Sequence, residues 1–402
     1  MTYNNPNING SNWSELNILE SLRKKNPLVI CITNDVVRTF TANGLLAIGA
    51  SPVMSECSED LKDLIVHASA LLINIGTVTP DKVTYYKEAV KLAKAHEVPI
   101  ILDPVGCHAG AYRLSVVLDL IKTGAISLLR GNQSEIKAIY DALNTNHKID
   151  SSLSGKGVDG EQVEDSAIIT YRLARQINCP VVATGEEDYV SDGTRVFAVP
   201  HGHSIMTAVT GTGCLLGAVL AAFFSSYYPF MDNLSIGEFL AYALAYYGLA
   251  GESAVKVSGV KPGIFSVAFM DALYEFDDAM LLSKNRIRPV VVPDQLKVYF
   301  ISGTQDVGFN ERHLLDTVEA ACRGGVTCFQ FREKGIGTLE GQQKLELAQQ
   351  LKEICAMYNV LYIINDDVDL AVAVNADGVH VGQEDMRLED VRNLVGNKVV
   401  GI

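Results

Sequence analysis

Short, continuously hydrophobic runs alternate with longer helical patterns over the first half of the chain, between Pro27 and Ala198. Each run ends in small or polar residues, and its apolar positions are continuous rather than alternating. Strands of that kind are covered on both faces, so the pattern predicts an α/β fold, a mostly parallel sheet with helices outside it. The predicted strands span residues 28–33, 70–75, 99–102, 126–129 and 181–184.

The pattern changes after residue 224. Helical patterns without strands continue to Leu282, and the basic, proline-containing segment 283–295 predicts a linker. From Leu296 the βα alternation starts again, which fits a TIM-type β/α barrel, but the sequence ends inside the fifth of the eight strands that a barrel needs. The predicted strands of this part span residues 298–301, 327–331, 361–364, 378–381 and 399–402.

A chain of 402 residues is too long for one ordinary domain. We expect a polar N-terminal tail at 1–13, a first domain at 14–282, the linker at 283–295 and a second, incomplete domain at 296–402. The formal net charge of -14 argues against nucleic acid or an anionic membrane as the main partner, because both are bound by clustered Lys and Arg.

The eight cysteines are scattered without the spacing of a zinc site, which predicts free, mostly buried thiols in a reducing, cytoplasmic environment. Residues 1–15 have neither the basic start nor the apolar segment of a secretory signal. Residues 204–231 carry no charge, but their continuous apolar part, 214–224, is shorter than the roughly 20 residues of a bilayer span. We therefore expect a buried helix there.

The run Thr210-Gly211-Thr212-Gly213-Cys214 opens onto an apolar helical stretch, 215–224. Glycines let the backbone approach a ligand, and the first turn of a helix offers unpaired N–H groups and the positive end of its dipole. The run indicates an anion-binding turn with Cys214 close to the ligand. A tight strand-to-helix turn without a ligand is the alternative.

Polar residues follow several of the predicted strands, where ligands of parallel sheets bind. Asp103 could hold Mg²⁺ directly or through water, Arg130 could reach a phosphate and Glu135 could help to bind a hydrated metal, and Thr184 closes a further strand. A metal carboxylate, a basic group and an anion-binding loop at one edge are what phosphoryl transfer needs.

Residues 14–282 resemble the hydroxyethylthiazole kinase family, which has a ribokinase-like αβα fold. The resemblance depends on many motifs in the family's order: Ile32-Thr33-Asn34, Thr41-Ala42-Asn43-Gly44-Leu45-Leu46-Ala47, Gly49-Ala50-Ser51-Pro52-Val53-Met54, Asn74-Ile75-Gly76-Thr77, Asp103-Pro104-Val105-Gly106, Arg130-Gly131-Asn132 and Thr210 to Cys214. One departure is Asp35, where many relatives carry a second Asn.

The resemblance implies transfer of the γ-phosphate of ATP to the hydroxyl of 4-methyl-5-(2-hydroxyethyl)thiazole, with Mg²⁺ as cofactor. It also implies a homotrimer with active sites between subunits, in which Asn34 and Met54 would act across an interface. The implied roles are thiazole binding by Asn34, Met54 and Gly211, ATP binding by Arg130, Thr184 and Gly213, metal binding by Asp103 and Glu135, and the catalytic base position for Cys214.

A cysteine in the base position is unusual, because related sugar kinases use an aspartate. A helix N-terminus and nearby Mg²⁺ lower the pKa of a thiol, whereas apolar burial raises it, so the sequence leaves the direction open. A loose, metaphosphate-like transition state demands little of the base. We therefore expect Cys214→Asp to keep or improve phosphorylation and Cys214→Ala to leave measurable activity.

In the second domain, two-residue alternation puts Gln330, Arg332 and Lys334 on one face at the end of a predicted strand, a basic group that suits an anion. Asn365 and Asp366 end the next strand, and Asp385 follows the one after. Two carboxylates at one rim suit Mg²⁺ and a diphosphate.

Residues 296–402 resemble the N-terminal half of thiamine phosphate synthase, on Ile363-Ile364-Asn365-Asp366-Asp367 and the segment 376–385. The resemblance implies that hydroxymethylpyrimidine diphosphate is bound by Gln330, Arg332, Lys334 and Asn365, with Mg²⁺ on Asp366 and Asp385. Because the family's loops for thiazole phosphate lie beyond Ile402, we expect a fragment without synthase activity that folds poorly after Leu296.

Two other functions stay open from the residues alone: another ribokinase-like kinase for hydroxymethylpyrimidine or a sugar, and a non-catalytic protein that binds a vitamin precursor. An apolar thioether at Met54 favours a flat heteroaromatic over a polyol, and the Asp103, Arg130 and Glu135 set disfavours a mere sensor. His201-Gly202-His203 could suggest a metal site, but without a third ligand nearby the two histidines are expected to be loop residues.

Overall fold

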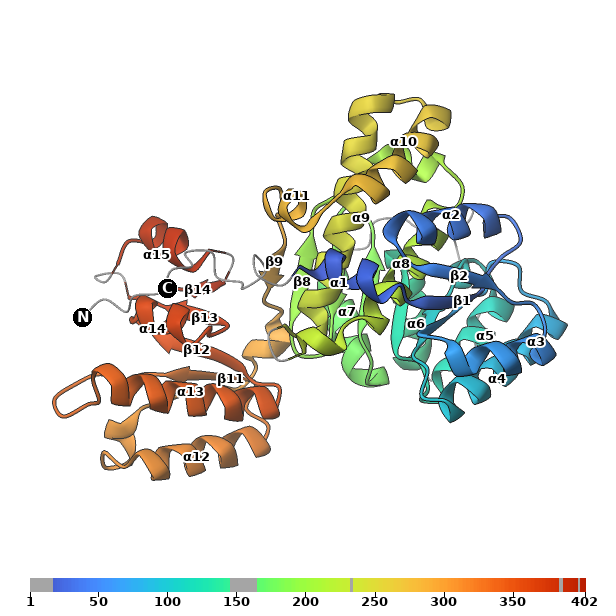
Figure 1. The fold of residues 1–402 in the computed structure, drawn as a ribbon. Coiled ribbons are helices and arrows are strands. Elements are labelled where there is room, and N and C mark those ends of the chain that lie inside the picture. The colour runs from blue at the N-terminus through green and yellow to red at the C-terminus, as the bar shows by residue number, and fades with distance from the viewer. Residues whose placement is uncertain (1–16, 145–164, 232–233, 383–385, 397) are drawn as a thin grey trace. The chain divides into compact units, whose positions relative to one another are not determined.

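The computed structural model describes residues 17–144, 165–231, 234–382, 386–396 and 398–402. The chain divides into two compact units, with the boundary between Ile287 and Arg288 (Figure 1). Each unit is built around its own sheet, and the two are described separately.

The sheet of the first unit has the strand order β2-β1-β3-β4-β5-β6-β7-β8. Strands β1 to β6 are parallel, and β7 and β8 are antiparallel additions. All five predicted strands are present, so the predicted parallel α/β sheet is confirmed. The strands are β1 (Leu28–Ile32), β2 (Ser51–Met54), β3 (Ala70–Asn74), β4 (Ile100–Asp103), β5 (Leu128–Asn132), β6 (Val181–Thr184), β7 (Asp188–Ser191) and β8 (Val196–Val199).

Three strands were not predicted: β2, β7 and β8. Each is only four residues long. Pro52 interrupts the apolar pattern of β2, and Asp188 and Ser191 interrupt that of β7. Short strands with polar or proline positions, such as β2 and β7, carry too little periodic signal to be recognised from sequence, whereas β8 is apolar throughout and was missed despite its pattern.

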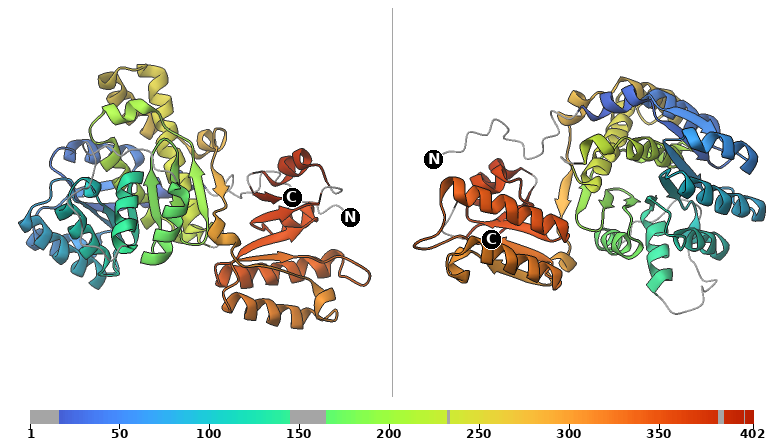
Figure 2. Two further views of the ribbon diagram at one scale, coloured as in Figure 1. Left: turned by 180° about the vertical axis from the view of Figure 1, so that it is seen from behind. Right: turned by 60° about the horizontal axis from the view of Figure 1, so that its bottom comes forward.

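Helices cover both faces of this sheet, which confirms the expected three-layer αβα arrangement (Figure 2). One face packs on α1 (Ile18–Lys25), α2 (Arg38–Ile48), α8 (Thr212–Ser225), α9 (Ile236–Ser258) and α10 (Pro262–Glu275). The other face packs on α3 (Ser58–Leu64), α4 (Pro80–Ala95), α5 (Ala111–Ile121), α6 (Gln133–Asn144) and α7 (Ser166–Ile177). Shorter helices are η2 (Ile65–His67), η3 (Cys107–Ala109), η4 (Ser204–Ala208), η5 (Tyr228–Phe230) and α11 (Asp278–Leu282).

The uncharged segment 204–231 contains α8, whose residues 215–223 are all buried against the sheet and its neighbouring helices. This is the buried helix that the sequence predicts. Among the helices of the described residues, none combines the length and the hydropathy that a bilayer span needs. The next helix, α9, begins with a capping box in which Ser235 and Glu238 satisfy each other's backbone N–H groups.

The second unit has a parallel sheet of order β10-β11-β12-β13-β14, as its βα pattern predicts. One face packs on helices around Phe329, Phe331 and Tyr362. On the other face, Tyr299 and Ile301 are 39% and 49% exposed. The elements are β10 (Tyr299–Ser302), η7 (Thr304–Val307), α12 (Glu311–Arg323), β11 (Cys328–Phe331), α13 (Gly341–Met357), β12 (Leu361–Asn365), α14 (Val368–Ala373), β13 (Gly378–His380), α15 (Leu388–Val395) and β14 (Val399–Gly401).

The segment predicted as a linker, 283–295, has some regular structure. It contains the three-residue strand β9 (Arg288–Val290) and most of the 3-10 helix η6 (Pro293–Leu296). Proline at the first position of η6 is compatible with a helix start, because that position needs no N–H donor.

Candidate active site

Four strands of the first unit, β3 to β6, end at the same edge of the sheet. Asn74 lies opposite Asp103, and Asn132 lies opposite Thr184, in the register of the parallel pairs. Parallel register therefore brings these strand ends together, as the sequence predicts.

Asp103 is the most buried member of this group, with no exposed surface. Its Oδ2 accepts a hydrogen bond from Asn74 Nδ2 at 2.8 Å and lies 3.6 Å from Arg130 Nη1. Its Oδ1 has no partner within the described part of the chain. Burial raises the pKa of Asp103 to about 6, against the charge of Arg130 and the bond from Asn74.

Arg130 joins two strand ends to the glycine turn. Its Nη2 donates to Thr184 Oγ1 at 3.0 Å, and a Cβ on Gly213 would lie 3.8 Å from both terminal nitrogens. Burial disfavours the charge, but the carboxylates of Asp103 and Glu135 outweigh it and raise the pKa of Arg130. Among the described residues nothing accepts from its buried Nε, so this N–H is available to a ligand.

Glu135 binds two backbone segments together. Its Oε1 accepts from the N–H of Gly106 and its Oε2 from that of Asn132, both at 2.7 Å. Burial, followed by the charge of Asp103, raises the pKa of Glu135 to about 7. Glu135 therefore holds the turn after β4 against the end of β5, and each of its oxygens keeps a second lone pair.

Oxygen donors suit Mg²⁺, and the carboxylates present fit such an ion. The partnerless Oδ1 of buried Asp103 and the raised pKa values of both carboxyl groups indicate a site in which a cation would stabilise the ionised forms. No cluster of three or more His, Cys, Asp or Glu side chains suited to a metal occurs among the residues that the structure describes. Water and phosphate oxygens would have to complete the coordination.

The glycine turn is held from several sides. Gly211 has φ +101°, and a Cβ there would lie 3.0 Å from Phe40 Cδ1 and 3.3 Å from Val37 Cγ1, so a larger residue is excluded. Thr212 Oγ1 donates to the carbonyl of Met206 at 2.7 Å. Tyr247 donates to the carbonyl of Thr212 at 2.6 Å. Because α8 begins at Thr212, its first-turn N–H groups have no partner within the helix.

Cys214 lies in the first turn of α8, and its Sγ is 3.2 Å from Asn34 Nδ2. Burial raises its pKa to about 11, and the charge of Asp103 adds to this effect. Hydrogen bonds from Asn74 and Asn34 and the charge of Arg130 act in the opposite direction but are weaker. The structure thereby resolves the direction that the sequence leaves open, and Cys214 is a thiol at neutral pH.

Met54 stands apart from this hydrogen-bonded cluster. It ends β2, the outermost parallel strand, lies opposite Cys31 and packs partly buried against the core. Asp35, where the sequence departs from its family's pattern, is exposed and pairs with Arg38 and with Lys82, the latter at 3.3 Å.

In the second unit, Gln330 Nε2 donates to Asn365 Oδ1 at 3.0 Å, and Lys334 Nζ to Asp366 Oδ2 at 2.7 Å. The prediction that Gln330, Arg332 and Lys334 share one strand face is wrong, because β11 ends at Phe331. Asp385 lies outside the described residues.

Glu333 follows the end of β11 and is partly buried. Its carboxylate accepts from the N–H of Thr304 at 2.8 Å and from that of Leu339 at 3.0 Å. These bonds tie the chain after β11 to the segment after β10. Arg332 and Lys334 are left exposed on this turn.

His201 and His203 are loop residues that bind neighbouring backbone and side chains. His201 Nε2 accepts from the N–H of Arg286, and His201 Nδ1 lies against Glu252 Oε1, both at 3.1 Å. His203 Nδ1 accepts from the N–H of Ile205 at 3.1 Å. Both histidines thus satisfy local hydrogen bonds, in agreement with the loop interpretation.

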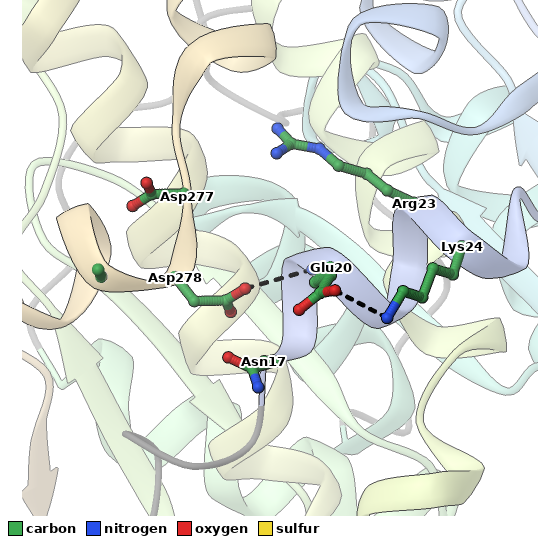
Figure 3. A pocket seen from close by; sticks show the side chains of 7 residues that line it. Asn17, Glu20, Arg23, Lys24, Asp277 and Asp278 are labelled. Atoms are coloured by element: carbon green, nitrogen blue, oxygen red, sulfur yellow. Dashed lines mark hydrogen bonds and ion pairs between the residues drawn. The ribbon is translucent and has the colours of Figure 1, made fainter.

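A surface hollow of about 560 Å³ lies between α1 and the start of α11 (Figure 3). Its charged side chains satisfy one another or nearby backbone. Asp278 accepts from the N–H groups of Leu19 and Glu20, and Arg23 donates to three carbonyls at the C-terminal end of α10, those of Leu273, Tyr274 and Phe276. The hollow marks the contact between two helical segments, and none of the predicted site residues line it.

Two residues of the cluster were not assigned a role from sequence, Asn74 and Tyr247. A polar residue at the end of the five-residue buried strand β3 was a usable signal for Asn74. Tyr247 lies inside the long apolar helix α9, where nothing in the sequence separates it from the other buried tyrosines.

Comparison with known proteins agrees with this geometry. The sequence model of the hydroxyethylthiazole kinase family matches residues 19–279, and that of thiamine monophosphate synthase matches residues 298–402. A hydroxyethylthiazole kinase of Streptococcus agalactiae is 49% identical over 267 residues, which is 66% of this chain and 99% of the relative. Hydroxyethylthiazole kinase 1 of Streptococcus pneumoniae is 42% identical over 271 residues, 67% of this chain and 99% of the relative.

A solved structure leads to the same family. The hydroxyethylthiazole kinase protein from Pyrococcus horikoshii OT3 is 35% identical, covers 68% of this chain and 98% of its own, and superposes with a TM-score of 0.59. The expected ribokinase-like fold and the fusion to a thiamine monophosphate synthase segment are therefore confirmed. The chain belongs to the hydroxyethylthiazole kinase family.

Proposed function

We propose that the cluster around Asp103, Arg130 and Cys214 is the active site in which this kinase transfers the γ-phosphate of ATP to the hydroxyl of 4-methyl-5-(2-hydroxyethyl)thiazole. One observation carries the proposal. A buried carboxylate and a buried guanidinium, each with one atom that has no partner among the described residues, meet the N-terminus of α8 at one sheet edge. The guanidinium and the helix N-terminus can neutralise a transferring phosphoryl group, and the carboxylate can hold the Mg²⁺ that adds to this neutralisation.

In this proposal Arg130 and Thr184 bind the ATP phosphates, and the backbone N–H groups from Gly213 onward receive the charge that develops on the γ-phosphate. The positive end of the α8 dipole adds to this stabilisation. Asn34, Met54 and Gly211 hold the thiazole alcohol. Gly211 leaves room for Phe40 and Val37, whose side chains would lie 3.0 and 3.3 Å from a Cβ there.

Asp103 and Glu135 would hold Mg²⁺, which supplies charge neutralisation for the bound phosphates. The protein's own contribution is to orient those carboxylates. Asn74 and Arg130 fix Oδ2 of Asp103, and two backbone N–H groups fix Glu135.

Cys214 is protonated at neutral pH, so it is a poor general base in the ground state. We propose that its main contribution is to hold the substrate hydroxyl in line with the γ-phosphate. The hydroxyl proton leaves late in a loose transition state, when its acidity has risen, and passes to an oxygen of the transferred phosphoryl group.

We propose that the chain assembles as a homotrimer in which Asn34 and Met54 lie at a subunit boundary. The position of Met54 on the outermost parallel strand, apart from the hydrogen-bonded cluster, supports this proposal. All eight cysteines are free, which supports a reducing cytoplasmic location. Light scattering would give the mass of the assembly, and a monomer with full activity would contradict the shared site.

For residues 298–402 we propose binding of hydroxymethylpyrimidine diphosphate by Gln330, Arg332, Lys334 and Asn365, with Mg²⁺ on Asp366 and Asp385. The bonded pairs Gln330–Asn365 and Lys334–Asp366 support a site at the ends of β11 and β12. We expect no synthase turnover by this chain, because its five-stranded sheet keeps one face partly exposed.

The kinase proposal is tested by ATP consumption with the thiazole alcohol, hydroxymethylpyrimidine and ribose, each with and without Mg²⁺. We expect Mg²⁺-dependent turnover with the thiazole alcohol at a kcat/KM at least about 100-fold above the other two, because the apolar Met54 side suits a flat ring. Faster turnover of hydroxymethylpyrimidine or ribose would assign the site to another alcohol.

A further inference from the structure

Asn74 is a buried amide at the centre of the active-site cluster. It is the last residue of β3, lies opposite Asp103 in the register of β3 and β4, and is 1% exposed. A buried amide has two donor hydrogens and an acceptor oxygen to satisfy, so its partners define its orientation.

The backbone determines which end of the amide faces which partner. The N–H of Gly76 lies 3.0 Å from Asn74 Oδ1, and an N–H can donate only to the oxygen. The amide nitrogen therefore points the other way, where it donates to Asp103 Oδ2 at 2.8 Å. Asn74 also lowers the pKa of the Cys214 thiol, against the larger effect of burial.

The oxygen of Asn74 has a second partner, Asn34. Asn34 Nδ2 donates to Asn74 Oδ1 at 3.1 Å and reaches Cys214 Sγ at 3.2 Å, while Asn34 Oδ1 accepts from the N–H of Val36 at 3.2 Å. A Cβ on Gly76 would lie 2.8 Å from Asn34 Nδ2 and 3.0 Å from Asn74 Oδ1. The glycine thus leaves the space that the amide pair fills.

We propose that Asn74 is a positioning residue for phosphoryl transfer: its nitrogen holds the Asp103 carboxylate beside the Cys214 thiol, and its oxygen holds the thiazole-binding amide of Asn34. With Oδ2 of Asp103 occupied by Asn74 and Arg130, Oδ1 stays directed away from them as the free ligand atom. This inference rests on the proposed function of the cluster.

Two substitutions separate the two ends of the amide. Asn74→Asp keeps an oxygen for Gly76 and Asn34 but replaces the donor toward Asp103 with a second carboxylate oxygen. We expect kcat to fall about 100-fold, because a misplaced reacting group costs on that order, while the KM for the thiazole alcohol stays within about threefold.

Asn74→Ala removes both ends of the amide. In addition to the fall in kcat, we expect thiazole binding to weaken about tenfold, because the Asn34 side chain loses one of its three hydrogen-bond partners. Calorimetric binding of the thiazole alcohol without ATP measures this effect independently of turnover. In this measurement Asn74→Asp should bind the thiazole alcohol like the wild type, and Asn74→Ala should bind it about tenfold more weakly.

Asn178→Asp is the matched control, because Asn178 is an exposed cap at the end of α7 and receives the same chemical change. Its kinetics should equal those of the wild type. A kcat of Asn74→Asp within threefold of wild type would overturn the proposal, as would equal losses of kcat and of thiazole binding in both Asn74 variants. A wild-type protein that does not phosphorylate the thiazole alcohol refutes the proposed function instead.

If Asn74→Asp lowers the thermal midpoint, a double-mutant cycle on thiazole binding distinguishes a positioning role of Asn74 from general destabilisation of the protein. Asn74→Ala and Asn34→Ala together should weaken binding little more than Asn34→Ala alone, because both act through one amide pair. Additive losses would overturn the proposal.

Discussion

The strand-end residues of the two units are held in different ways. In the first unit, Asp103, Arg130 and Glu135 are at most 7% exposed, and each is bonded to another strand end or turn. In the second unit, Gln330 is equally buried, but Arg332 and Lys334 are exposed beyond the end of β11. The first site is buried and organised by the protein alone, whereas the basic groups of the second are exposed, with Lys334 paired to Asp366 just after β12.

Covering helices account for part of this difference. In the first unit α8 packs over the strand ends, and a Cβ on Gly217 would lie only 3.2 Å from Asp103 Oδ2, so the glycine allows the close approach. In the second unit the face with Tyr299 and Ile301 stays partly exposed. Burial strengthens electrostatic interactions. The charged residues of the first unit should therefore interact more strongly with a bound ligand than the same residue types in the second unit.

The largest effect is expected at Asp103. Asp103→Asn keeps the shape of the side chain but removes the negative charge that pairs with Arg130 and with a bound cation. We therefore expect kcat to fall about 1000-fold. Steady-state kinetics with ATP and the thiazole alcohol measure this loss. A large fall in the thermal midpoint of this variant would indicate that Asp103 mainly stabilises the fold. The first unit would then no longer differ from the second in having a preorganised site.

Substitutions of Cys214 measure how much kcat depends on the group in the catalytic base position. We expect Cys214→Ala to lose about 10- to 100-fold in kcat and Cys214→Asp to keep or improve it, because a carboxylate is ionised where the thiol, with a pKa of about 11, is not. Complete loss in the alanine variant with ATP binding intact would contradict this view.

Protease resistance compares the two units directly. We expect limited proteolysis to cleave within 288–402 before 17–287, roughly tenfold faster, because local opening is easier where one sheet face lacks a full cover. Fragments identified by mass spectrometry give the order of cleavage. Equal resistance of both units would show that the exposed face does not weaken the second one.

The smallest expected effect concerns His201 in the first unit. Burial lowers its pKa below 6.5, against Glu252 and together with the charge of Arg286. The unfolded chain therefore binds the proton more readily, so the stability contributed by neutral His201 is complete above pH 6.5 and falls as the pH drops below it.

His201→Gln keeps an acceptor for the N–H of Arg286 without the titration. Its thermal midpoint should fall less between pH 7 and pH 5 than that of the wild type. An identical fall in both proteins would show that His201 does not contribute to acid sensitivity.

Much of this architecture was predictable because it depends on local patterns. The continuous apolar runs define β1, β3, β4, β5 and β6, and parallel strands necessarily bring Asp103, Arg130 and Thr184 to one edge. The strands β2 and β7 escaped prediction because Pro52 and Asp188 break the pattern. Arg332 and Lys334 were misplaced because β11 ends at Phe331, after which Glu333 bonds to backbone N–H groups of Thr304 and Leu339.

The sequence by itself determined the α/β elements, the glycine turn and the family, since each of these is written in residues close together along the chain. Only the tertiary structure decided that Cys214 is protonated and that Asn74 lies between Asp103, Asn34 and Cys214. Asn34 and Cys214 are 180 positions apart, and their hydrogen bond exists only once β1 and α8 have packed. Proton affinity and amide orientation depend on burial and on such distant partners, which no local pattern records.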